Sequence, residues 1–189
     1  LIRFAAAAVL VFALVAVGTS IMHDANHGSF SPHRWVNHTL ASTSDLLGAS
    51  SWFWRTQHNV LHHGNTNVVG FDGDIELAPW ARLAPTQPWQ PRFRWQHIYI
   101  WPLYGFISLK NLLVSDFSTI RSNRIGQQPL REPVTASVAA RVIAGKVAHV
   151  GWAIVVPLLF NPWWAVLAFY FVCSWTVGFL LAIIFQLAH

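Results

Sequence analysis

The stretch FAAAAVLVFALVAVGTSIM, residues 4–22, has no charged side chain and runs directly into HDANH, residues 23–27. As a helix, residues 4–22 would measure about 28 Å, close to the roughly 30 Å of a bilayer's hydrocarbon core. A secretory signal peptide is the alternative, but no small-residue cleavage site follows Met22. We therefore expect residues 4–22 to cross a membrane.

The composition also indicates a membrane protein. The 189 residues are 54% hydrophobic and only 10% charged, with a mean hydropathy of +0.41. Cys173 is the one cysteine, which excludes an intrachain disulfide and a cysteine-based zinc site. The net charge of +5 comes from basic residues interspersed with all seven acidic ones, so a membrane surface explains it better than nucleic acid.

Two further apolar runs, residues 142–160 and 163–187, are separated only by Asn161 and Pro162, which predicts a transmembrane hairpin. With three spans, His189 emerges on the same side of the membrane as residues 23–27. The polar segment between the first and second spans, residues 23–141, would then form a cap on that side.

Basic residues at the second span, Arg141 and Lys146, favour a cytoplasmic cap. Among membranes we favour a bacterial inner membrane. The chain starts at Leu1 and stops within an apolar run, so we expect a single domain, 1–189, truncated at both ends.

Within the cap, His97–Val114 is apolar but interrupted by Pro102 and Gly105, which predicts an interfacial helix or a pair of half-turns. His38–Trp54 is expected to form a short helix with Ser42 or Ser44 as its N-cap. Loops are expected at 70–79 and 84–91. The predicted fold class is an all-α integral membrane bundle of about three spans with a histidine-rich helical cap.

Five histidines form two clusters, and their spacing predicts metal binding. His23 with His27, and His58 with His62, are four residues apart and would project from one face of a helix. His63 is rotated by about 100° from His62 and would point to a neighbouring position, toward a second ion. Imidazole ligands suit Fe, Cu, Ni and Zn rather than Mg or Ca, so we expect a transition metal.

Polar neighbours of the clusters are candidates for orienting the imidazoles. Asp24, Asn26 and Asn59 are expected to accept the imidazole N–H groups, with helix capping as the alternative role. The acidic residues of GFDGDIE, residues 70–76, are alternatively ligands, orienting acceptors or a solvated loop. The isolated histidines are expected to be hydrogen-bonded or interfacial side chains rather than ligands; they are His33, His38, His97 and His149.

The segments HDANHGSFSPHRWVN, residues 23–37, and WRTQHNVLHHGNTNVVGFDGDIE, residues 54–76, resemble the first two histidine boxes of the membrane fatty acid desaturases. The resemblance covers essentially the whole chain. It implies a di-iron centre with its metal ligands in the two boxes and in the closing FQLAH: His23, His27, His58, His62, His63 and His189.

The chain also departs from the family pattern. It has no third histidine box and no leading span of the first hairpin, and Asn65 stands where many relatives have Tyr. We therefore expect this segment alone to be inactive.

The resemblance implies an oxidoreductase of fatty acid biosynthesis and lipid metabolism. Such an enzyme uses two Fe ions and O2 to insert a cis double bond into an acyl chain linked to CoA, a carrier protein or a lipid. Electrons come from NAD(P)H through a ferredoxin or a b-type cytochrome, and the chain has no haem-binding His-Pro-Gly-Gly stretch, so an external donor is expected.

Aromatic residues are candidates for the wall of an acyl channel, with ordinary core packing as the alternative: Trp52, Phe53, Trp54 and Trp152. Arg121, Arg124 and Arg131 are candidates for binding a phosphate-bearing headgroup or CoA, with anchoring to lipid headgroups as the alternative.

Two other functions remain open. A hydroxylase or ketolase on the same scaffold would add oxygen instead of removing two hydrogens. A non-enzymatic haem or metal carrier would place paired histidines within its spans, where only His149 lies deep in one. The uncharged first span argues against a zinc transporter.

Overall fold

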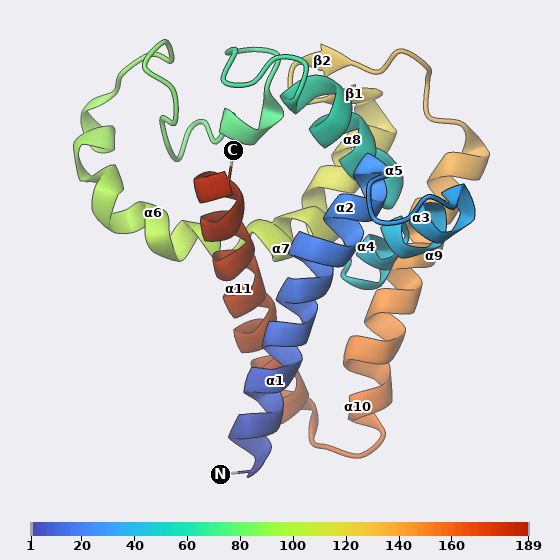
Figure 1. The fold of residues 1–189 in the computed structure, drawn as a ribbon. Helices are drawn as coiled ribbons and strands as arrows, with labels where there is room; N and C mark the ends of the chain where they lie inside the picture. Colours follow the sequence, from blue (N-terminus) through green and yellow to red (C-terminus); the bar gives the residue numbers. More distant parts are fainter. Residues whose placement is uncertain (1, 189) are drawn as a thin grey trace.

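The computed structural model describes residues 2–188, and helices make up most of this part of the chain (Figure 1). Three helices are long and apolar enough to cross a membrane: Ile2–His27, Ala136–Leu158 and Trp163–Leu187. The prediction of an all-α membrane protein with three spans is confirmed.

Each span has a simple make-up. The first comprises α1 (Ile2–Ala16), the π-helical turn η1 (Val17–Ile21) and α2 (Met22–His27). The second comprises α9 (Ala136–Val150), the π-helical turn η6 (Gly151–Val155) and α10 (Val156–Leu158), and the third is α11 (Trp163–Ala188). The first histidine pair therefore lies at the end of a membrane helix, which stops at Gly28 with a φ of 76°.

The cap between the first and second spans consists of short elements at one end of the three long helices (Figure 1). In chain order they are α3 (Arg34–Ala41), α4 (Thr43–Leu46), α5 (Ser51–Arg55), the π-helical η2 (Thr56–His62), the 3-10 turns η3 (Gly73–Ile75) and η4 (Pro91–Trp95), α6 (Gln96–Tyr104), α7 (Ile107–Lys110), the π-helical η5 (Asn111–Ser115), α8 (Asp116–Ser122), β1 (Arg124–Ile125) and β2 (Gln128–Pro129). The two strands form a small antiparallel hairpin.

The expected single helix over His38–Trp54 is wrong, because the chain breaks into α3, α4 and α5. Gly48 has a φ of 87°, a conformation that ends the helical path after α4. The N-cap that the structure uses is Ser50, whose Oγ accepts the backbone N–H of Phe53 at 3.3 Å. This cap starts the helix that carries the second histidine box.

The segment around Pro102 and Gly105 divides into α6 and α7, as its sequence predicts. A Cβ on Gly105 would lie 2.2 Å from the Trp175 ring, so only glycine allows α11 to approach this closely. On the same side of α11, Ile100 and Tyr104 of α6 pack with Ala81 and Ala182 in a buried cluster.

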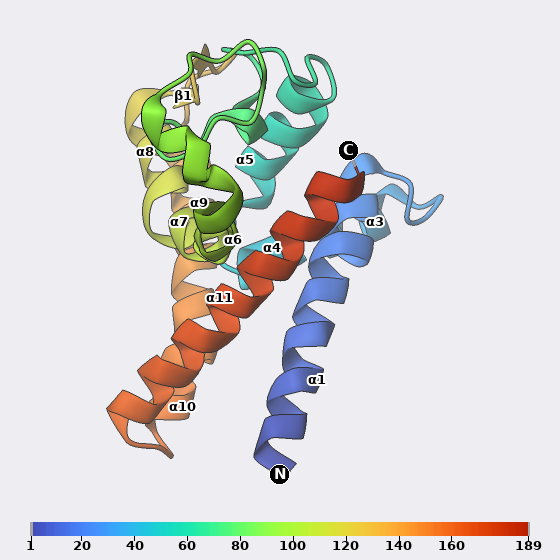
Figure 2. The same ribbon diagram turned by 90° about the vertical axis from the view of Figure 1, so that its left-hand side faces the viewer.

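The third span packs against the first span and reaches the cap. Val11 and Val15 of α1 pack against Val177 of α11, and the two helices converge toward the cap (Figure 2). At the end of α11, the Phe185 ring lies 5.9 Å from the His23 ring and 6.2 Å from the His58 ring, measured between centroids. The end of α11 thus lies beside both histidine clusters.

Candidate metal centre

The two histidine clusters meet in space although they lie on different helices. α2 carries His23 and His27, and the continuous helix α5–η2 carries His58 and His62. His58 is central: its Nε2 lies 3.2 Å from Nε2 of His23 and 3.2 Å from Nε2 of His63. The structure therefore gathers the five clustered histidines at one place.

The second cluster lies in a π-helical turn, which changes the expected side-chain directions. The backbone N–H of His63 donates to the His58 carbonyl at 3.0 Å, a five-residue hydrogen bond typical of a π-helix. Residues five apart then share a face, so His63 faces His58 instead of pointing to a separate position. π-turns of this kind are frequent at functional sites.

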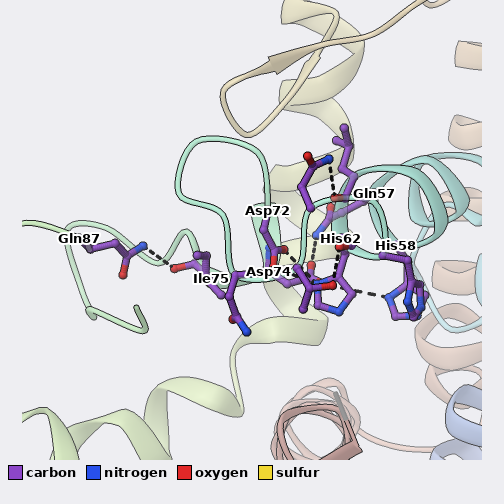
Figure 3. A network of polar contacts seen from close by, with 12 residues as sticks. Gln57, His58, His62, Asp72, Asp74, Ile75 and Gln87 are labelled. Atoms are coloured by element: carbon purple, nitrogen blue, oxygen red, sulfur yellow. Dashed lines mark hydrogen bonds and ion pairs between the residues drawn. The ribbon is translucent and has the colours of Figure 1, made fainter. Parts of the chain in front are cut away.

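Two of the imidazoles have a carboxylate at Nδ1. Nδ1 of His23 lies 3.1 Å from Asp24, and Nδ1 of His62 lies 3.0 Å from Asp72. The Asp72 side chain is fully buried, and it also accepts the backbone N–H groups of Asn67 and Asp74 (Figure 3). Because a carboxylate accepts only, Nδ1 carries the proton and Nε2 carries the lone pair that a metal requires.

The Asp74 carboxylate lies near both His58 and His62 of the second cluster. Its Oδ2 lies 3.5 Å from Nδ1 of His62 and 3.9 Å from Nδ1 of His58, and Gln57 donates to its Oδ1 at 2.5 Å (Figure 3). Although burial opposes ionisation, the His58 and Gln57 side chains hold the pKa of Asp74 below its usual value. A carboxylate is therefore favoured at this position.

Two groups of side chains have ligand atoms within 4.8 Å of one another, a spacing that one ion can bridge. One group is His23, His27 and His58, and the other is His58, His62 and Asp74. Burial and the neighbouring His58 and His62 imidazoles lower the pKa of His63, which favours the neutral form that binds metals. The donor set, nitrogen with one carboxylate, suits iron and other transition metals.

Comparison with known proteins agrees with this arrangement. The family model described as fatty acid desaturase matches residues 2–189. The chain belongs to the fatty acid desaturase family. The expected resemblance is thereby confirmed, and no solved structure matches this chain.

Three relatives illustrate the similarity. An acyl-lipid (8-3)-desaturase of Physcomitrium patens is 36% identical over 94% of this chain and 38% of its own length. The sn-1 linoleoyl-lipid 6-desaturases of Arthrospira platensis and Synechocystis sp. are each 32% identical, over 96% and 100% of this chain and 49% and 52% of their own lengths. The chain thus spans about two fifths to one half of the length of the curated relatives that it matches.

The asparagines of the desaturase boxes join the two helices. Asn59 Nδ2 donates to the Asn26 carbonyl at 2.8 Å, and Arg55 Nε donates to Asn26 Oδ1 at 3.3 Å. Asn26 itself is buried and donates to the carbonyl and the sulfur of Met22. These bonds hold α2 against the helix of the second box, a role that the box spacing did not reveal.

A cavity of about 360 Å³ opens beside the second box and extends between the spans. His58 and His62 line it at the cap, Gly18 and Cys173 line it between α1 and α11, and His149 lines it on α9. Pockets of this size are typical of small-molecule sites. A guest in this cavity would lie beside the histidine cluster.

The structure separates the predicted substrate residues into two groups. Phe53, Trp54 and Trp152 line the cavity, and the Trp54 ring stacks on His58 with centroids 4.3 Å apart. Trp52 lies outside that lining. The arginines Arg121, Arg124 and Arg131 are exposed and also lie outside it.

The remaining residues fall into simple classes. His149 is hydrogen-bonded to the Leu46 carbonyl and to Tyr170, each at 2.8 Å. Glu76 binds loop groups, accepting from Gly70 N–H and Gln127 Nε2 at 3.0 Å each. The predicted ligand His189 lies outside the described residues. Asp72 is buried and is therefore not a solvated loop residue. The Asp-x-Asp spacing alone does not distinguish these two possibilities.

Proposed function

We propose that this chain supplies two histidine boxes and the acyl cavity of a desaturase that inserts a cis double bond into a fatty acyl chain with O2. The single observation that carries the proposal is that His58 and His62 belong both to the histidine cluster and to the cavity wall. A substrate carbon held in the cavity would therefore lie next to the metal ligands.

The metal ligands that we propose are His23, His27, His58, His62, His63 and His189. Three features support two Fe ions at this cluster: the close approach of the Nε2 atoms to one another, the carboxylates at Nδ1 of His23 and His62, and the nitrogen-rich donor set. When bound, the irons supply the O2-dependent oxidising power for removing two hydrogens from the chain.

The chain's own residues would bind and orient the substrate. Apolar side chains of α1 and α11 surround the cavity and exclude water, while the indole of Trp54 fixes the His58 ring by stacking. Asp72 would hold the Nδ1 proton of His62, so this imidazole keeps one tautomer and one orientation.

The substrate class that we propose is an acyl chain linked to a membrane lipid, because the relatives described above are named for acyl-lipid desaturation. The cavity lies between membrane spans, where the chain of a lipid can enter. Trp52, Arg121 and Arg124 lie outside the cavity lining, so we assign the arginines to headgroup contacts at the membrane surface.

We further propose that the boxes face the cytoplasm and that NAD(P)H supplies electrons through an external ferredoxin or b-type cytochrome. The exposed Arg141 at the start of the second span supports this orientation.

Fatty-acid profiling by mass spectrometry tests the proposal. A host that makes the intact protein is expected to gain a lipid-linked acyl chain two hydrogens lighter than its precursor. His62→Ala should abolish this product, and His97→Ala, an exposed histidine outside the cavity lining, is the matched control. A product with one added oxygen would indicate a hydroxylase, and an unchanged profile would contradict both enzymes.

A further inference from the structure

Residues 47–50 form a non-helical loop between α4 and α5 that packs against a membrane span. His149 Nδ1 and Trp152 Nε1, both on the second span, donate to the Leu46 carbonyl at 2.8 and 3.0 Å. A Cβ on Gly48 would lie 3.2 Å from the His149 ring, so the loop is in contact with that helix. These side chains of the span thus bind the end of α4, where the loop begins.

Lys146 adds a charge to this contact. Its Nζ donates to the Gly48 carbonyl at 2.6 Å, to the Asn111 carbonyl at 2.8 Å and to Asp116 Oδ2 at 2.5 Å. Lys146 is 7% exposed and Asp116 is 6% exposed. Lys146 lies about 15 Å along the helix from Ala136, so it is a buried charge within the span.

Asp116 extends the network to the start of α5. Its Oδ2 also accepts the backbone N–H of Ser50 at 3.0 Å, and Ser50 is the N-cap of α5. From Ser50 the chain runs as one helix through α5 and η2 to His58 and His62. The ion pair is therefore attached to the origin of the helix that carries the second histidine box.

Ionised groups inside a membrane are costly, and those that occur usually serve a function. A buried ion pair contributes little stability over well-packed apolar residues, whereas removing one partner leaves an uncompensated charge. Stability alone therefore gives a weak reason for a Lys–Asp pair here. The pair's two hydrogen bonds to the 47–50 loop, at the Gly48 carbonyl and the Ser50 N–H, give a specific one.

We propose that Lys146 and Asp116 are positioning residues for the metal centre. The ion pair fixes where α5 begins, and that position directs the second histidine box toward the first. The inference rests on the proposed function, because it assumes that the boxes share metal ions. By this inference Lys146, on the second span and outside both histidine boxes, helps to position the metal site.

Titration of the purified intact protein with Co²⁺ tests this role, because the visible absorption of Co²⁺ reports the number and arrangement of its ligands. Lys146→Met is expected to weaken Co²⁺ binding about tenfold and to change the spectrum, as loss of an orienting contact commonly does. Arg141→Met, at an exposed position on the same helix, should bind like wild type.

A double variant separates positioning from stability. Lys146→Met with Asp116→Leu removes both charges, so the unfolding temperature is expected to recover toward wild type. Co²⁺ binding should nevertheless stay about tenfold weaker, because the loop has lost the groups that hold it. This variant also serves if the single variant fails to fold.

Two results would overturn the inference in distinguishable ways. Wild-type Co²⁺ affinity and spectrum in the double variant would show that the ion pair does not position the box, and the metal centre would stand. A wild-type protein that binds no Co²⁺, or a His62→Ala variant that binds it equally well, would contradict the metal centre and the inference with it.

Discussion

Replacing Asp72 by Asn tests how the second histidine box is oriented. Asp72 is fully buried and accepts three N–H groups: Nδ1 of His62 at 3.0 Å, the Asn67 backbone at 2.8 Å and the Asp74 backbone at 2.9 Å. Asn keeps the size of the side chain, but its NH2 group donates and cannot accept. At least one of the three donors therefore loses its partner.

The expected magnitudes follow from this geometry. Loss of a carboxylate behind a metal-binding imidazole lowers metal affinity about 10- to 100-fold, equivalent to about 1.4–2.8 kcal/mol. A buried donor without an acceptor costs about 1–3 kcal/mol of folding stability. Asp72→Asn is thus expected to show both effects, in a Co²⁺ titration and in a thermal unfolding experiment.

Glu76→Gln is the matched control, because Glu76 lies in the same loop and binds Gly70 N–H and Gln127. Both donors bind Oε1, which the amide oxygen of Gln can replace, so stability and metal affinity should both stay near the wild-type values. If Asp72→Asn binds metal as tightly as Glu76→Gln does, the carboxylate does not orient His62 for a metal and the reasoning fails.

Three further results are expected. Gly105→Ala should lower the folding stability by about 1–3 kcal/mol, because its Cβ would lie 2.2 Å from the Trp175 ring. Gly151→Ala should leave the stability near the wild-type value, because a Cβ there has nothing within 4 Å. Equal unfolding temperatures for the two variants would contradict the close approach of α11 to Gly105. Cys173→Trp should fill the cavity and lower product formation at least about tenfold, while Co²⁺ binding stays unchanged. Val172→Trp, at a position 59% exposed, should remain active. Equal activity of the two variants would contradict the proposal that the cavity holds the substrate. Removal of metal by a chelator should leave the far-UV circular dichroism unchanged, because the bonds of Asn59 and Arg55 to Asn26 hold the boxes together without metal, and a large loss of helical signal would refute this.

The sequence predicts the spans because length and hydropathy alone determine them. The uncharged stretch 4–22 and the two runs beside Asn161-Pro162 are long enough for a bilayer, and each lies in a long apolar helix of the structure. The histidine spacing likewise indicates which residues gather, since four-residue spacing on a helix brings side chains to one face.

Other features depend on contacts that are distant in sequence. The π-turn that directs His63 toward His58 is a register change that the spacing rule for an α-helix does not contain. The sequence shows Lys146 as a basic residue at the second span, and only the structure shows that it pairs with Asp116 on another helix. The break before Ser50 combines a local cause, the positive φ of Gly48, with contacts between the loop and α9 that the local sequence does not show.

The most direct test of the central claim is the iron content per molecule of the purified intact protein, measured for wild type and for His62→Ala. The account predicts about two irons in wild type and a clear loss in the variant, because His62 is a proposed ligand held by Asp72. Wild-type protein without iron, or equal iron in both proteins, would contradict the claim that the histidine cluster is a metal centre.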